Sequence, residues 1–227
     1  MATPKKKKLP ADLSPIMVAP PPVQLPSLNE IHKSTPDDGW GALKTVVSTL
    51  FEHSPVLDDH LVPNLGSSSS SSPFASYEDL IDRSAEIIRS WPQVLRSTFI
   101  SGHPRIGEQN PKQLSALSAA AEQARYATPQ WVIERLGWLN GVYERRYGGL
   151  RYITFVNGRT RREIMEEMEG AVGVGKARGP EWKEEEGECL VEGEVEVGGE
   201  EWSKELERAV GEVILIAKDR VKKLGLI

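Results

Sequence analysis

Cysteine is scarce in this chain of 227 residues, which contains only Cys189. A single cysteine excludes an internal disulfide and any metal site built from several thiolates. The four histidines offer no other route to a metal centre, because no two of them lie four residues apart as a helical metal-binding pair requires. We therefore expect no bound metal, and we interpret Cys189 as incidental.

Long apolar runs and an excess of positive charge are also lacking. No stretch approaches the ~18 apolar residues of a membrane-spanning helix, and the lysines at 5–8 lack the apolar stretch of a signal peptide. The net charge of −5 argues against general affinity for nucleic acids. The C-terminal Gly225-Leu226-Ile227 differs from the Ser-Lys-Leu ending of peroxisomal proteins. We expect a cytoplasmic protein with no nucleic-acid or membrane partner, a peroxisomal location being the alternative.

Composition divides the chain into one folded domain and three polar segments. With 39% hydrophobic residues, the chain is long enough for one compact core, which we assign to residues 28–227. Residues 1–27 are rich in proline and poor in aromatic side chains, so we expect a disordered tail. Inside the domain, a serine run predicts a flexible linker at 66–73, and the glycine-rich, acidic stretch 170–202 predicts a mobile insertion.

Apolar spacing predicts an all-α fold, a single-domain bundle of several helices. The longer helices are expected where apolar residues recur every three or four positions, over 40–51, 76–91, 128–148 and 203–224. Shorter helices are expected at 92–99, at 114–127 and after the capping box formed by Thr160 and Glu163. Residues 152–156 are β-branched and aromatic, and no partner strand of similar quality occurs elsewhere. They predict one short extended segment.

His103-Pro104 and Glu122-Gln123 are the residues best suited to chemistry. An imidazole with a pKa of about 6.5 exchanges protons at neutral pH, and a nearby carboxylate adds a second acid or base. The apolar Phe99 and Ile100, followed by Gly102, predict that this histidine lies at a helix end. From spacing alone, however, His103 fits a loop histidine bonded to the backbone better, and Glu122 fits a solvated charge on a helix.

These motifs and their order resemble those of the OHCU decarboxylase family, in a fungal-like form. The resemblance spans roughly residues 28–224. Besides the His-Pro and Glu-Gln pairs, the matching blocks are Leu50-Phe51-Glu52-His53-Ser54-Pro55, Leu139-Asn140-x-x-Tyr143 and Tyr152-Ile153-Thr154-Phe155-Val156-Asn157-Gly158-Arg159. The resemblance implies a carboxy-lyase of urate degradation that converts 2-oxo-4-hydroxy-4-carboxy-5-ureidoimidazoline into (S)-allantoin and CO2. It also implies a homodimer that needs no cofactor, because the imine of this substrate takes up the electrons released with CO2.

The same resemblance implies roles for individual residues. His103 and Glu122 become the catalytic acid–base pair, and the substrate-binding residues become Pro104, Ala119, Gln123, Tyr152, Ile153, Thr154, Phe155, Val156 and Arg220. Ala119 departs from the family pattern, which has a serine three residues before the glutamate; the neighbouring Ser118 is turned by about 100° around a helix. Arg220 resembles a late arginine that holds a carboxylate by two hydrogen bonds, although an arginine near a helix C-terminus is favourable on electrostatic grounds alone.

Two other functions fit parts of the sequence. The chain fits a non-catalytic helical module whose acidic stretch, residues 181–207, binds a basic partner, and Ala119 favours this alternative. It also fits a hydrolase that acts on a related ureide. Loss of absorbance from a freshly made urate-oxidation intermediate distinguishes the binding module from an enzyme, because a binding module leaves the spontaneous decay rate unchanged.

Overall fold

The computed structural model describes residues 23–107, 128–182 and 193–226 of the chain. Every regular element in these ranges is a helix, which confirms the predicted all-α fold. None of the described helices is long and apolar enough to cross a membrane. In chain order the elements are α1 (Leu28–Lys33), the 3-10 turn η1 (Pro36–Asp38), α2 (Gly41–Phe51), the π-helical turn η2 (Leu57–Leu61), α3 (Val62–Ser69), α4 (Tyr77–Ser90), α5 (Gln93–Ser101), α7 (Gln130–Arg146), α8 (Arg161–Val172) and α10 (Glu200–Lys223).

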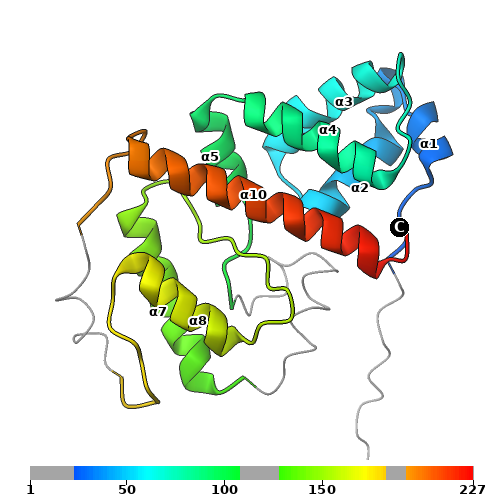
Figure 1. Cartoon of the computed structure of the whole chain (residues 1–227). Helices are drawn as coiled ribbons and strands as arrows, with labels where there is room; N and C mark the ends of the chain where they lie inside the picture. Colours follow the sequence, from blue (N-terminus) through cyan, green and yellow to red (C-terminus); the bar gives the residue numbers. More distant parts are fainter. Residues whose placement is uncertain (1–22, 108–127, 183–192, 227) are drawn as a thin grey trace, which may run out of the picture.

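Helix α10 runs through the middle of the described structure. Its apolar residues recur every three or four positions and therefore lie on one stripe, which is buried as predicted and includes Leu206, Val210, Val213, Ile214, Ala217 and Val221. α10 packs on α2, α4 and α5, and Figure 1 shows α7 and α8 on its other side. The helix begins at Glu200 and not near Ser203, because Trp202 is buried and its Nε1 donates to the Gly148 carbonyl oxygen at 3.0 Å.

The N-terminal helices bury the apolar faces that their spacing predicts. Helix α4 begins where the Ser76 hydroxyl accepts a hydrogen bond from the Asp79 N–H, which satisfies one of the open donors of the first turn. Helix α2 buries Leu43, Val46, Val47, Leu50 and Phe51. Since each such side chain stabilises the fold by about 1.5–3 kcal/mol, this small core holds the C-terminal end of α2 firmly in place.

The α7–α8 pair encloses a buried ion pair. Arg135 Nε donates to Glu169 Oε1 at 2.9 Å, and the two side chains are 4% and 0% exposed. Arg135 Nη2 also donates to the Gly175 carbonyl oxygen at 2.8 Å, and the Ala177 N–H donates to Glu169 Oε1 at 2.9 Å. Buried charges persist only when they are paired and hydrogen-bonded, so this network attaches the segment after α8 to both helices.

The first part of the serine run is helical, whereas the sequence predicted a flexible linker at 66–73. Helix α3 continues through it to Ser69. The hydroxyl groups of Ser68 and Ser69 donate to the carbonyl oxygens of Leu65 and Gly66 at 2.9 Å each. Serine hydroxyls that bond back onto the preceding turn are compatible with a helix, and composition alone does not reveal such bonds.

The predicted boundaries of the acidic insertion also differ from the structure. Its first residues belong to α8, which ends at Val172, and its last residues belong to α10. Between them, the Val195 N–H donates to the Arg146 carbonyl oxygen at 2.8 Å. Residues 183–192 of the insertion, residues 1–22 of the predicted tail and the predicted helix 114–127 lie outside the described residues.

Candidate functional site

His103 lies directly after the C-terminal end of α5, as predicted from the apolar residues that precede it. Gly102 is the last residue of helical conformation, and the His103 N–H donates to the Ile100 carbonyl oxygen at 3.1 Å. The imidazole turns back onto the helix, where its Nδ1 lies 2.9 Å from the Phe99 carbonyl oxygen. Its ring packs edge-on against the Phe99 ring, with the two ring centres 4.8 Å apart. Only 6% of the residue is exposed, so the ring is fixed and largely dry.

These contacts determine the protonation state of His103. Burial lowers its pKa from the ordinary 6.5 to about 4; the Phe99 carbonyl and the negative charge of Glu52 oppose this shift, and the positive charges of Arg220 and Arg151 add to it. The ring is therefore neutral at pH 7. Because a carbonyl oxygen only accepts, Nδ1 holds the proton and Nε2 has the lone pair. Nε2 is buried without a hydrogen-bond partner among the described residues, so it is available to accept a proton.

The turn that contains His103 and Pro104 is held by two residues that the sequence analysis did not select as site residues. Arg151 Nη1 donates to the His103 carbonyl oxygen. Asn140, on α7, donates from Nδ2 to the carbonyl oxygens of Ile106 and Leu136 at 2.9 and 2.8 Å. A signal for Asn140 was present, since a buried amide on an otherwise apolar helix face requires hydrogen-bond partners.

The C-terminal end of α2 approaches the same turn. A Cβ atom placed on Gly102 would lie 3.5 Å from the hydroxyl oxygen of Ser54, which follows α2. Glu52 is the C-cap of α2, is only 7% exposed and has a backbone φ of +65°, a conformation that residues other than glycine rarely adopt. Such a conformation persists only when surrounding contacts hold it, and the Glu52 side chain is held by an ion pair with Arg220.

Arg220 enters this cluster from the last turns of α10. Its Nη1 donates to the carbonyl oxygens of Thr49 and Leu50 at 3.0 Å each, and its Nη2 donates to Glu52. The guanidinium thus satisfies two carbonyl groups in the last turn of α2, where carbonyls have no partner within the helix. This contact joins helices at opposite ends of the chain beside His103, while the predicted bond from Arg220 to a substrate carboxylate stays a prediction.

Residues 152–156 run between α8 and α10 with alternating contacts. The Tyr152 hydroxyl and Thr154 Oγ1 both donate to Glu167 of α8, at 2.6 and 3.2 Å. The backbone groups of Ile153 and Phe155 face side chains of α10 instead. Alternation with a period of two is typical of an extended chain, so these contacts support the predicted extended conformation.

Arg151 connects the two predicted parts of the site, because it bonds to the backbone of His103 and directly precedes Tyr152. Tyr152, Ile153 and Thr154 are buried, whereas Phe155, Val156 and Pro104 are half-buried. The other predicted residues, Glu122, Gln123 and Ala119, lie outside the described residues. The described part of the candidate site is therefore His103 with the residues that hold it and the extended segment.

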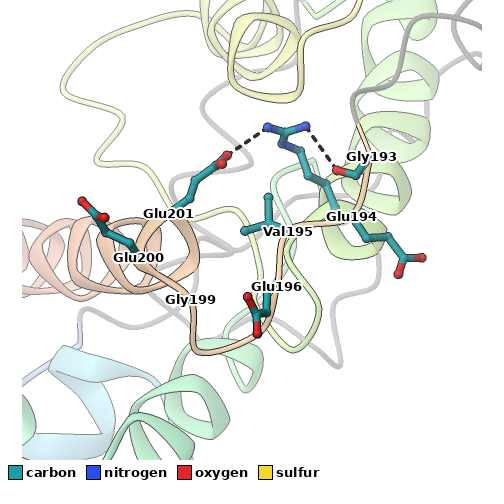
Figure 2. Close-up of a pocket in the computed structure, with 8 residues that line it drawn as sticks. Gly193, Glu194, Val195, Glu196, Gly199, Glu200 and Glu201 are labelled. Carbon is teal, nitrogen blue, oxygen red and sulfur yellow. Dashed lines mark hydrogen bonds and ion pairs between the residues drawn. The ribbon is translucent and has the colours of Figure 1, made fainter.

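An open depression of about 450 Å³ lies elsewhere, at the N-terminal end of α10 (Figure 2). Arg146 at its wall donates to Glu201 at 2.9 Å and to the Gly193 carbonyl oxygen at 3.4 Å. The lining also contains Glu194, Glu196 and Glu200, and it contains none of the predicted site residues. Like charges repel, so this acidic depression is unsuited to a substrate with a carboxylate.

Comparison with known proteins indicates the family of the chain. A family model described as OHCU decarboxylase matches residues 41–192, a range that includes His103, the block around Glu52 and residues 152–156 but not α10. Comparison with curated proteins gave no significant match. Because the family model covers more than half of the chain, the chain belongs to the OHCU decarboxylase family, a family of carboxy-lyases that act in urate degradation.

Proposed function

We propose that this protein converts 2-oxo-4-hydroxy-4-carboxy-5-ureidoimidazoline into (S)-allantoin and CO2, with His103 as the base. The single observation that supports this role most strongly is the buried, neutral imidazole with an unpartnered Nε2. A base must be deprotonated at working pH, and burial lowers the pKa of the His103 imidazole and so keeps the ring neutral. The substrate itself supplies the electron sink, so the reaction is proposed to need no cofactor.

In the proposed reaction, His103 Nε2 accepts the proton of the ring hydroxyl group. The bond between the ring carbon and the carboxylate breaks, CO2 leaves, and the bonding electrons enter the adjacent imine. Protonation of the former imine carbon and the ring nitrogen then gives allantoin, with one proton from water balancing the lost carboxylate charge. Positioned proton transfer of this kind contributes typically ~10²–10⁴ in rate. Glu122 is proposed as the second acid–base group, and protonation from one face gives the (S) enantiomer.

The extended segment is proposed to hold the ureide of the substrate. Thr154 is 3% exposed, and no hydrogen bond joins its backbone N–H or C=O to another described residue. A buried backbone donor and acceptor side by side require partners, and the N–H and C=O groups of a ureide match them. Tyr152 and Val156 flank this edge. Pro104, Gln123 and Arg220 are proposed to complete the binding site.

The test uses urate oxidised freshly by urate oxidase and hydrolysed to the unstable intermediate, followed by absorbance and circular dichroism. The proposal predicts that the protein accelerates loss of the intermediate and that the product solution is optically active. An unchanged decay rate would show a binding module instead of an enzyme. Accelerated decay that releases no CO2 would show a hydrolase and would equally refute the proposal.

A further inference from the structure

We propose that Arg208 and Glu212 of α10 act as positioning residues that take the place of a partner strand along one edge of the extended segment. Arg208 Nη1 donates to the Ile153 carbonyl oxygen at 2.8 Å, and Glu212 Oε2 accepts from the Phe155 N–H at 2.5 Å. The inference rests on the proposed function, and it extends it by identifying the residues that set the position of the binding segment.

The two contacts reproduce the bonds that a neighbouring strand would make. In an extended chain, the C=O of one residue and the N–H of the second residue after it point to the same edge. The C=O of Ile153 and the N–H of Phe155 therefore both point to α10. The backbone groups of Thr154 point to the opposite edge. α10 thus occupies one edge of the segment and leaves the other for a ligand.

The spacing of the two side chains on α10 matches the spacing of the two backbone groups along the extended segment. Arg208 and Glu212 are four residues apart on one helix, which separates them by about 6 Å along the axis. Two residues of extended chain span about 6.6 Å. One turn of helix therefore presents a donor and an acceptor at nearly the spacing of the two backbone groups, and a shift of the segment by one residue would break both bonds.

Arg208 is itself held in place by a second layer of contacts. Glu205 accepts from Arg208 Nε and Nη2 at 2.8 and 2.6 Å, a two-point contact that fixes the plane of the guanidinium. The Tyr143 hydroxyl donates to Glu205 at 2.5 Å, and burial together with the charge of Glu205 raises the Tyr143 pKa, so this donor stays protonated. The guanidinium also lies over the Tyr152 ring, 5.1 Å from its centre.

The inference predicts a specific kinetic effect, because the positioning residues do not touch the reacting atoms. Glu212→Leu leaves the Phe155 N–H without its acceptor, so the binding edge loses its position. We expect KM to rise at least about tenfold, the factor that one hydrogen bond to a charged group typically contributes, while kcat changes less than about threefold. Glu212→Gln keeps an oxygen acceptor and should restore KM to near the wild-type value.

Glu207→Leu is the matched control. Glu207 lies on the same helix, is about half exposed and pairs with Arg89 and Arg96 at 3.0 and 2.9 Å, away from the extended segment. This variant loses two ion pairs of α10 and should keep the wild-type KM. Thermal unfolding of each variant separates a loss of stability from a change in the position of the extended segment.

A wild-type KM in Glu212→Leu, with a loss of stability similar to that of Glu207→Leu, would overturn the inference while the proposed function stands. A wild-type protein without activity on the intermediate would overturn both. If Glu212→Leu fails to fold, Arg208→Lys decides the question. It keeps the positive charge but loses the two-point contact with Glu205, so an unchanged KM in that variant would also overturn the inference.

Discussion

Burial of His103 predicts how the stability of the protein depends on pH. The pKa of His103 is about 4 in the folded protein, against an ordinary value of 6.5. The folded value lies below the unfolded value, so between these pH values the unfolded chain binds more protons. Stability should therefore fall as the pH is lowered from 6.5 to 4. Since each pKa unit corresponds to 1.36 kcal/mol, the contribution of His103 over this range is about 3 kcal/mol.

The assay is urea unfolding of the wild-type protein and of His103→Asn at several pH values between 4 and 7.5. Carboxylates also titrate in this range, but they do so in both proteins, so the difference between the two unfolding free energies isolates His103. We expect this difference to change by about 3 kcal/mol from the neutral to the acidic end. His53→Asn serves as a control, because the His53 side chain is 67% exposed.

A difference that stays constant within about 0.5 kcal/mol across the range would refute the reasoning. It would mean that His103 can be protonated without cost in the folded protein, and hence that the imidazole is solvated. Nε2 would then not be a dry, neutral base, and the predicted stability profile would be absent.

Three further predictions concern other residues. Glu122→Gln should lower kcat by roughly 100-fold with an unchanged far-ultraviolet circular dichroism spectrum; wild-type turnover would exclude Glu122 from the chemistry. Glu169→Ala leaves Arg135 buried without its carboxylate partner and should lower the free energy of unfolding in urea by about 3–5 kcal/mol. The double variant Arg135→Met with Glu169→Leu should lose less, and equal losses would contradict this prediction. Gly66→Ala places a Cβ 2.5 Å from a ring carbon of Trp40 and should destabilise the fold by about 1–3 kcal/mol. A raised melting temperature would contradict this and would show that the Trp40 ring moves aside.

The sequence predicted the elements whose signals are local. The apolar face of α2 and the stripe of α10 follow from spacing, and the structure buries both. The capping box of Thr160 and Glu163 is formed at the start of α8 as predicted. Each of these signals lies within one helix, where the backbone geometry determines which side chains meet.

The sequence could not predict the contacts that join distant segments beside His103. Arg220 and Glu52 are 168 positions apart, and nothing in the spacing of either residue indicates that they pair. Glu205, Arg208 and Glu212 likewise look like ordinary charges on the polar face of a helix. Their role becomes visible only when α10 is placed against residues 152–156. Packing between segments, and not local propensity, therefore determines the supports of the site.

The central claim is that Nε2 of His103 takes a proton from the substrate. The most direct test is the rate at which His103→Asn consumes the freshly made intermediate at pH 7, compared with the wild-type protein at equal concentration. The account predicts a rate at least about 100-fold lower, with wild-type helix content and optically inactive product from spontaneous decay. Undiminished formation of optically active allantoin by His103→Asn would contradict it.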